Sequence, residues 1–183
     1  TLLASSAASD VYKRQVRTLT EVVTPAKGYQ YLQKFGFTTL VNDDPDYPGM
    51  TDIAQATALG GITRGVYNIE MTAAYASIAN GGIYTEPILY TEILDHDGNV
   101  LIDNSTPETH EVIKESTAYL LTSAMEDVIT SPNGTGGAAR MSNMAVAGKT
   151  GTTNDSTDLW LSAYTPYYTA SIWVGYDENK SMN

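Results

Sequence analysis

Two spacings of hydrophobic residues recur along most of the chain. A spacing of three to four residues, typical of amphipathic helices, begins at Val16 and at Pro25 and recurs over residues 68–79 and 114–129. Runs rich in β-branched and aromatic residues predict strands over residues 89–94, 99–102, 159–165 and 169–176 and within the stretch 145–153. The last three strands have short connections, which favours an antiparallel meander. We therefore expect an α+β fold in which helices pack on an antiparallel sheet.

Local signals mark where the helices begin and end. Thr24 is placed to cap a helix whose first residue is Pro25, because threonine accepts N-terminal N–H groups and proline needs no N–H partner there. Gly36 is expected to end that helix, and Gly81 and Gly82 the helix over 68–79. In the helix over 114–129, the predicted core-facing stripe consists of Ala118, Leu121, Met125 and Val128.

Three polar segments could be interpreted as metal or catalytic sites. For each of them we favour an ordinary solvent-exposed turn or loop. His96 lies in the sequence Asp95–Gly98, which is a typical hairpin turn. His110 has no second ligand at metal-binding spacing, and the Asp-rich loop 42–49 has Pro48 where a calcium loop would need an oxygen ligand. We therefore expect solvated turns and loops, and neither a metal nor another cofactor.

Composition narrows the class of protein further. The chain has 183 residues, of which 42% are hydrophobic and 17% charged, as in an ordinary globular domain. A formal net charge of −11 argues against binding to nucleic acid. The chain contains no cysteine, so disulfides, zinc–thiolate sites and cysteine nucleophiles are excluded.

The stretch Ala145–Thr153 carries the clearest candidate chemistry. Small and β-branched residues lead into Lys149, Thr150 and Gly151, which read as a strand. On a strand, Lys149 and Gly151 point to one face, and Thr150 to the other. A strand edge with a cation, hydroxyl groups and free N–H groups suits an anionic, peptide-like substrate.

A phosphate-binding P-loop is the main competing interpretation of Gly148-Lys149-Thr150. That loop requires a glycine five residues before Gly148, and Asn143 occupies the position. The segment after Lys149 is also a poor start for the helix that a P-loop needs. We therefore reject the P-loop.

The motif and its flanking segments together resemble a known enzyme family. Lys149-Thr150-Gly151, followed by Thr152 and Thr153, resembles the third active-site motif of penicillin-binding proteins and serine β-lactamases. The flanking segments resemble the transpeptidase domain of class A (bifunctional) penicillin-binding proteins, and they occur in the family's order. They are Ala58 to Val66, Glu70 to Ala76, Ala79 to Gly82, Gly134 to Gly136, Ala138 to Arg140, and Trp173 to Asp177.

The resemblance implies specific roles for this stretch. Lys149 would supply positive potential in the active site. The hydroxyls of Thr150 and Thr152 would bind the terminal carboxylate of a D-Ala-D-Ala stem peptide or of a β-lactam, and the N–H of Thr152 would donate to the oxyanion. Lys149 and Thr152 are thus the catalytic candidates. The substrate-binding candidates are Lys149, Thr150, Gly151, Thr152 and Thr153.

The family's nucleophile is not found in this chain. In the family a Ser-x-x-Lys motif supplies the serine, and here no lysine has a serine three positions before it. Ser131-Pro132-Asn133 matches the second motif, Ser-x-Asn, in letters, but we interpret it as a chance match because it follows the wrong elements. We expect the fragment alone to be inactive. The alternatives are a D,D-carboxypeptidase or β-lactamase-type hydrolase and a non-catalytic penicillin-binding-like module.

The resemblance also predicts how the chain is organised. Residues 16–183 would form a partial penicillin-binding transpeptidase domain. Its parent would carry an N-terminal glycosyltransferase domain and a membrane-anchoring N-terminal helix, and would act on the extracytoplasmic face of the bacterial membrane. Residues 5–15 match the translation of a transposase adapter used for sequencing libraries. We therefore interpret residues 1–15 as an artefact of that kind, or as an unrelated arm.

Overall fold

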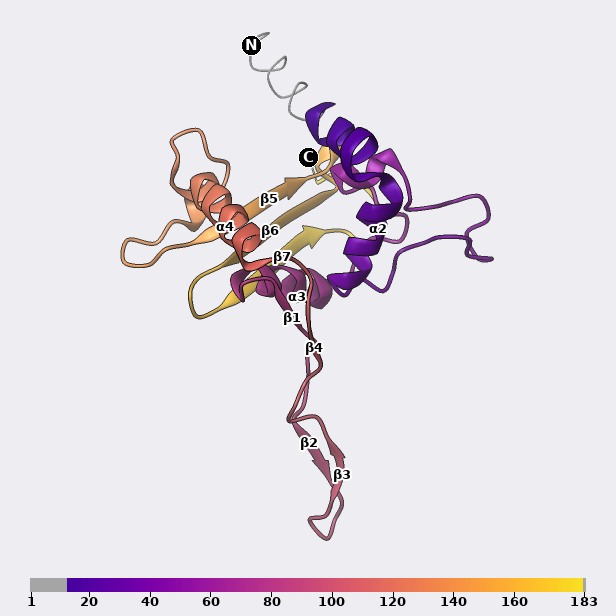
Figure 1. Cartoon of the computed structure of the whole chain (residues 1–183), viewed down its shortest axis with the longest axis vertical. Helices are drawn as coiled ribbons and strands as arrows, with labels where there is room; N and C mark the ends of the chain where they lie inside the picture. The colour runs from indigo at the N-terminus through magenta and orange to yellow at the C-terminus, as the bar shows by residue number, and fades with distance from the viewer. Residues whose placement is uncertain (1–12, 183) are drawn as a thin grey trace. The chain divides into compact units, whose positions relative to one another are not determined.

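The computed structural model describes residues 13–182. The chain forms two compact units, one that runs to Tyr67 and one that begins at Asn68 (Figure 1). In the segment interpreted as an adapter, residues 1–12 lie outside the described residues. Its last three residues, 13–15, are helical.

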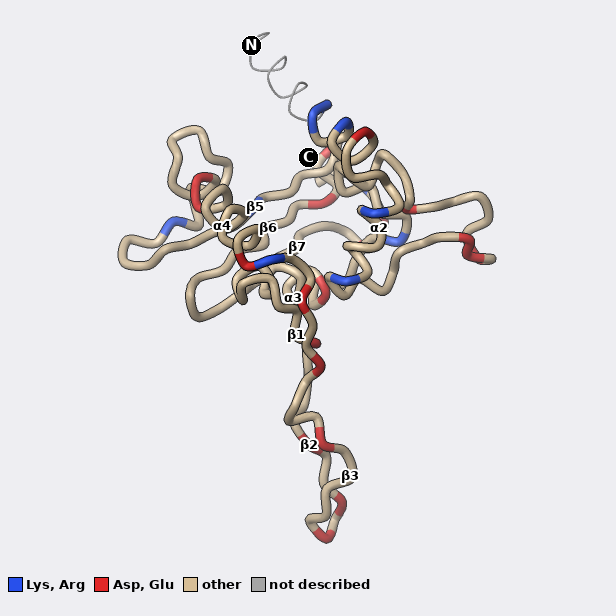
Figure 2. The backbone as a smooth tube through the Cα atoms, viewed as in Figure 1, with Lys and Arg blue, Asp and Glu red and all other residues tan. Residues whose placement is uncertain are grey.

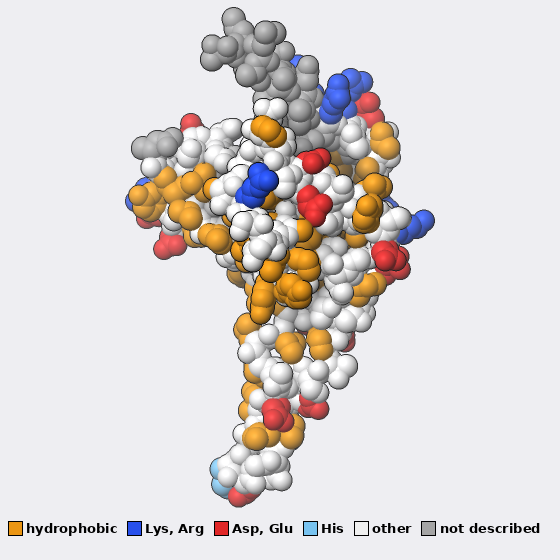
Figure 3. Space-filling model, turned by 90° about the vertical axis from the view of Figure 1, so that its left-hand side faces the viewer, with side chains coloured by type: hydrophobic (Ala, Val, Ile, Leu, Met, Phe, Trp, Pro, Cys, Tyr) orange, Lys and Arg blue, Asp and Glu red, His pale blue; other side chains and the backbone are white. Residues whose placement is uncertain are grey.

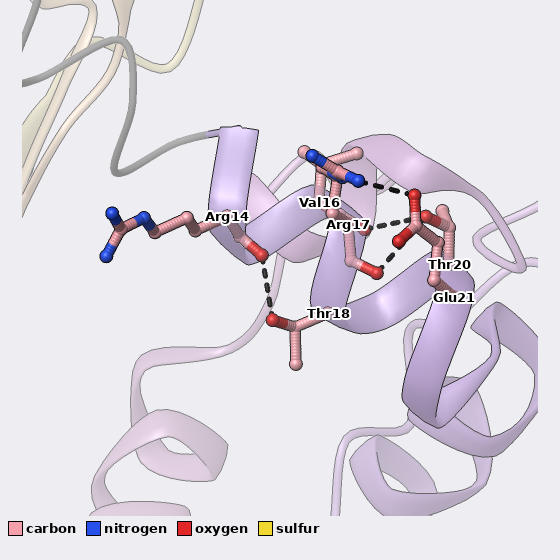
Figure 4. A network of polar contacts seen from close by, with 6 residues as sticks. All are labelled: Arg14, Val16, Arg17, Thr18, Thr20 and Glu21. Atoms are coloured by element: carbon pink, nitrogen blue, oxygen red, sulfur yellow. Dashed lines mark hydrogen bonds and ion pairs between the residues drawn. The ribbon is translucent and has the colours of Figure 1, made fainter.

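The first unit begins with the helix expected at Val16, although its later part has an unexpected geometry. Residues 13–17 are α-helical and lead into the π-helix η1, Thr18–Val23. The Thr18 hydroxyl donates to the carbonyl of Arg14 at 2.8 Å, and the Thr20 hydroxyl to that of Val16 at 3.0 Å (Figure 4). Hydroxyls that bond to carbonyls four residues earlier perturb an α-helix. Here these two hydrogen bonds occur where the α-helix changes into the wider π-helix η1.

The predicted cap of the next helix is confirmed. Helix α2, Pro25–Lys34, starts with the Thr24 hydroxyl accepting the N–H of Lys27 at 3.3 Å. Gly36 follows the helix with a φ of 87°, a conformation that glycine adopts without steric cost. The short 3-10 helix η2, Gln55–Leu59, is the other helical element of this unit in the described chain.

A buried carboxylate joins segments of the first unit that follow α2. Asp52 is 2% exposed and accepts three hydrogen bonds. The donors are the Val41 N–H at 2.7 Å, the Thr63 N–H at 2.8 Å and the Thr63 hydroxyl at 2.7 Å. This carboxylate therefore ties together two segments that lie on either side of it in the sequence.

The second unit begins with helix α3, Asn68–Ala79, which matches the predicted bounds. Gly81 and Gly82 end it with φ values of 63° and 93° and turn the chain into β1, Ile83–Thr85. Strand β1 pairs antiparallel with β4, Thr109–Glu111. Gly82 is central to this junction, because its N–H donates to the Ser77 carbonyl and its own carbonyl accepts from Val112, both at 2.8 Å.

The predicted hairpin connects β1 and β4. Its strands, β2 (Glu92–Leu94) and β3 (Val100–Asp103), are antiparallel. Strand β2 is shorter than the predicted 89–94, and β3 has the predicted length, one residue later in the chain. Asp95 fixes the tip, since its carboxylate accepts the N–H groups of Asp97 and Asn99, each at 2.8 Å. Hydrogen bonds to its carboxylate lower the pKa of Asp95, led by those from the side chain and backbone of Asn99. The hairpin carries acidic and apolar side chains and neither lysine nor arginine (Figures 2 and 3).

The predicted meander forms the sheet of the second unit. Strands β5 (Ala147–Thr152), β6 (Asp158–Tyr164) and β7 (Thr169–Gly175) pair antiparallel in that order. Helices α3 and α4 (Glu115–Thr130) lie on the same side of it (Figure 1). A core cluster joins Met125 of α4 to Ala147 of β5 and Tyr164 of β6, with Tyr75 and Ile78 of α3 packed against it.

The predicted stripe of α4 is wrong at Leu121. Ala118 and Met125 are buried as expected and Val128 is half-buried, but Leu121 is exposed. Thr122 and Ile129 lie on the core-facing side instead. The Thr122 hydroxyl lies 2.6 Å from the Tyr164 hydroxyl of β6. A polar residue of α4 therefore faces the sheet, which a stripe chosen by hydrophobicity does not include.

The opposite face of the sheet exposes several apolar side chains. Cross-strand partners share a face, so Leu159 of β6 lies beside Val174 of β7, and both are exposed. Ile172 on the same face is 56% exposed. A contiguous apolar face of this kind is typical of a surface that packs against other protein.

Replacing Tyr164 with phenylalanine is expected to destabilise this packing by about 1 kcal/mol. Burial raises the pKa of Tyr164, so the phenol stays protonated at neutral pH. Because Thr122 gives its own proton to the Ala118 carbonyl at 2.9 Å, Tyr164 must donate to Thr122. Amide hydrogen exchange in α4 measures the loss. Tyr167→Phe, at a turn residue that is 74% exposed, is the matched control and should leave exchange unchanged.

Candidate active-site strand

The stretch singled out from the sequence forms an edge strand. Strand β5 pairs with β6 on one side, and within the described residues no strand pairs with its other side. Its first half is buried, at Ala147 and Gly148, while Lys149 and Thr152 are exposed. The strand therefore runs from the core of the second unit to a surface where its motif residues are accessible.

The register of the sheet sets which motif residues share a face. Lys149 pairs with Ser162 and Gly151 with Trp160, so these lie on the helix-covered face together with Tyr164. Thr150 pairs with Leu161, and Thr152 with Leu159, on the opposite face. The alternation expected from the sequence is therefore confirmed.

The hydrogen-bond ladder indicates where the backbone groups of the motif point. The N–H of Thr153 donates to the Asp158 carbonyl at 3.1 Å, which makes these two residues a hydrogen-bonded pair. Such pairs alternate along an antiparallel ladder, so the N–H and C=O of Thr150 and Thr152 point away from β6. The open edge of β5 thus presents backbone donors and acceptors beside the two threonine hydroxyls.

Lys149 keeps its positive charge close to that edge. Its ammonium donates to the carbonyl of Thr150 at 2.7 Å. Like the other backbone groups of Thr150 and Thr152, this carbonyl points away from β6. The Lys149 ammonium therefore lies at the open edge of β5. An exposed cation held there raises the local concentration of anionic ligands.

Two glycines in the strand allow close packing. A Cβ at Gly148 would lie 2.7 Å from the Ala163 Cβ, too close for any side chain. A Cβ at Gly151 would lie 3.3 Å from the Trp160 Cβ. The neighbouring strand β6 therefore lies close to the backbone of β5 at both glycines.

Thr153 lies just beyond β5, where the chain turns into β6. Its hydroxyl lies 2.7 Å from the Thr157 hydroxyl and accepts the N–H of Asp158 at 2.8 Å. Asp158 in turn accepts the indole N–H of Trp173 at 2.9 Å. These contacts fix the β5–β6 turn and leave Thr150 and Thr152 as the motif hydroxyls on the strand itself.

One contact to the motif was not expected from the sequence. The hydroxyls of Thr150 and Thr135 lie 2.7 Å apart, and Thr135 belongs to the loop between α4 and the 3-10 helix η3, Gly137–Ala139. Sequence reasoning singled out this loop for its resemblance and gave Thr135 no role. Only the fold brings these two residues together.

The other sequence candidates lie apart from the strand. His96 is at the hairpin tip with its side chain 89% exposed, and its Nε2 lies 3.2 Å from Asp97. Ser131, in the Ser-x-Asn match, is the C-terminal cap residue of α4. Within residues 13–182, no group of three or more histidine or acidic side chains could hold a metal ion.

Comparison with known proteins identifies the family. Residues 9–182 match the family described as the penicillin-binding protein transpeptidase domain. Penicillin-binding protein 1A of Clostridium acetobutylicum is 44% identical over 156 residues, which cover 85% of this chain and 18% of that protein. A second clostridial relative, from Clostridium botulinum, is likewise covered over 18% of its length. The chain thus spans less than a fifth of these relatives.

Solved structures agree with this assignment. The crystal structure of penicillin-binding protein 1A from Haemophilus influenzae shares the fold, with a TM-score of 0.72 at 22% identity over 94% of this chain and 29% of that one. The PonA1 protein of Mycobacterium tuberculosis in complex with penicillin V gives a TM-score of 0.64 at 27% identity, over 81% of this chain and 41% of that one. Among the described residues, none of the helices is long and apolar enough to span a membrane. The chain belongs to the transpeptidase domain family of penicillin-binding proteins, among those of the 1A type.

Proposed function

We propose that the parent protein is a peptidoglycan D,D-transpeptidase that cross-links stem peptides through a serine acyl-enzyme. The observation that carries the proposal is the open edge of β5, where Lys149, Thr150 and Thr152 gather a cation, two hydroxyls and outward backbone groups. The family match and the penicillin V complex of the PonA1 relative support it.

In this proposal the edge of β5 is one wall of the active site. The carboxylate at the end of a D-Ala-D-Ala stem peptide lies against the hydroxyls of Thr150 and Thr152. A β-lactam places its own carboxylate there in the same way. Lys149 supplies the positive charge that compensates this carboxylate and orients the serine of the Ser-x-Asn motif.

The N–H of Thr152 is the oxyanion donor that this chain contributes. During acylation the carbonyl oxygen of the scissile bond becomes negative, and a donor fixed by the backbone stabilises it without reorganisation. Gly151 lets β5 lie close to β6 just before this donor, and Thr153 fixes the turn that follows it. The strand thereby holds the Thr152 N–H in place.

The other parts of the reaction come from outside these 183 residues. The serine nucleophile and its lysine base belong to a Ser-x-x-Lys motif that this sequence does not contain. The polypeptide on its own would therefore be inactive, and its exposed apolar sheet face would lack a cover. We further propose an N-terminal glycosyltransferase domain and a membrane anchor that places the site on the extracytoplasmic face of the membrane.

The experiment is cross-linking by the purified parent protein on uncross-linked peptidoglycan strands. Transpeptidation predicts the release of D-alanine together with cross-linked muropeptides, both abolished by penicillin. Release of D-alanine without cross-links would identify a carboxypeptidase instead. Absence of both, with no penicillin adduct, would leave a non-catalytic module and refute the proposal.

A further inference from the structure

The Thr150 hydroxyl has a partner on a neighbouring loop. Its oxygen lies 2.7 Å from the hydroxyl oxygen of Thr135, and either group could be the donor. Thr135 is 15 residues away in the sequence, on the loop between α4 and η3. The contact therefore links the motif to a separate loop.

That loop is held firmly against the end of α4. The N–H of Gly134 donates to the Ser131 carbonyl at 2.9 Å, and the N–H of Gly136 to the Val128 carbonyl at 3.0 Å. A Cβ at Gly134 would collide with the Val128 carbonyl, and one at Gly136 would lie 2.6 Å from Cδ1 of Ile129. The residues on either side of Thr135 are thus fixed by backbone hydrogen bonds to the end of α4, and at Gly134 also by a close backbone contact that only glycine permits.

Which hydroxyl donates matters for an anionic ligand. A threonine hydroxyl has a single proton, and a carboxylate can only accept hydrogen bonds. If Thr150 gives its proton to Thr135, it turns lone pairs toward the carboxylate and repels it. If Thr135 donates instead, the proton of Thr150 is free for the ligand, and the two hydroxyls polarise each other in a favourable direction.

We propose that Thr135 is a positioning residue that donates to Thr150 and thereby directs the Thr150 proton to the ligand carboxylate. The inference rests on the proposed function, because it requires a carboxylate beside Thr150. It adds a residue that acts through Thr150 and does not itself touch the ligand. Because Thr135 is exposed, water competes for its proton, and a moderate effect of about threefold to tenfold is expected.

The test compares two ligands that differ only in the carboxylate. The second-order rate constant for acylation of the purified parent protein is measured with benzylpenicillin and with benzylpenicillin methyl ester. Thr135→Val should lower the rate for the acid about threefold to tenfold and the rate for the ester by less, because a neutral ester carbonyl is a weaker acceptor than a carboxylate. Thr135→Ala, which adds no methyl group to the loop, should give the same ratio, and Thr135→Ser should restore the wild-type ratio.

Thr122→Val is the matched control, because it also removes a threonine hydroxyl paired with another hydroxyl, between α4 and β6. It should leave the ratio of acid to ester rates unchanged. An equal loss for both ligands in the folded Thr135→Ala protein, or no loss for either, would overturn the inference alone. A wild-type parent that neither ligand acylates would overturn the proposed function and the inference with it.

Discussion

Lys149→Ala is expected to slow acylation of the parent protein by benzylpenicillin about 10²-fold. In the structure the Lys149 ammonium lies 2.7 Å from the Thr150 carbonyl, at the edge where the ligand carboxylate is proposed to bind. A hydrogen bond to a charged group contributes about 1.5–3 kcal/mol, which corresponds to roughly 10- to 150-fold. The measurement is the acylation rate constant obtained with a fluorescent penicillin.

Two further variants separate the charge of Lys149 from general damage. Lys149→Arg keeps the charge with a different shape and should recover part of the rate. Lys180→Ala removes an exposed lysine whose ammonium lies 4.4 Å from the centre of the Tyr176 ring, and it should acylate like the wild type. A Lys149→Ala protein that reacts at the wild-type rate would refute the role of this lysine.

The largest stability effect is expected at Gly82, where alanine should cost about 3–5 kcal/mol. The residue has a φ of 93°, which is strained for any residue with a side chain. A Cβ there would also collide with the backbone carbonyl of Ile113, and a backbone atom cannot rotate away as a side chain can. The junction of α3, β1 and β4 would have to open to admit it.

Gly81 supplies the control for this prediction. It also has a positive φ, of 63°, but the nearest atom to a Cβ would be the flexible Glu115 Cγ, at 3.6 Å. Gly81→Ala should therefore cost only the left-handed conformation, about 1–2 kcal/mol. Amide hydrogen exchange in α3, β1 and β4 of the parent protein measures both local losses. Equal losses in the two variants would contradict the prediction, because they would mean that the contact with the Ile113 carbonyl adds little to the loss at Gly82.

Features set by neighbouring residues in the chain were predictable from the sequence. Thr24 caps α2 because its hydroxyl needs only an N–H three residues later, and the bounds of α3 follow from its composition and its terminal glycines. The meander of β5, β6 and β7 follows from short strands with short connections. The resemblance to penicillin-binding transpeptidases was likewise visible in the sequence, and the family match and the similarity to penicillin-binding protein 1A of Clostridium acetobutylicum confirm it.

Features that depend on distant partners were not predictable. Thr122 faces the core because Tyr164, 42 residues later, meets its hydroxyl, so a stripe chosen by hydrophobicity placed Leu121 inside wrongly. Asp52 is buried because Val41 and Thr63 converge on it. The contact between Thr135 and Thr150 arises only once the loop packs on α4. Each of these polar pairs is specified by the tertiary fold and has no local sequence signal.

The central claim is that the edge of β5 forms the wall of a serine acyl-enzyme site. A crystal structure of the parent protein after reaction with benzylpenicillin tests it most directly. The account predicts a covalent penicilloyl serine whose carboxylate lies within hydrogen-bond distance of the Thr150 and Thr152 hydroxyls, with the acyl oxygen facing the Thr152 N–H. An adduct whose carboxylate and acyl oxygen lie away from this strand would contradict the account.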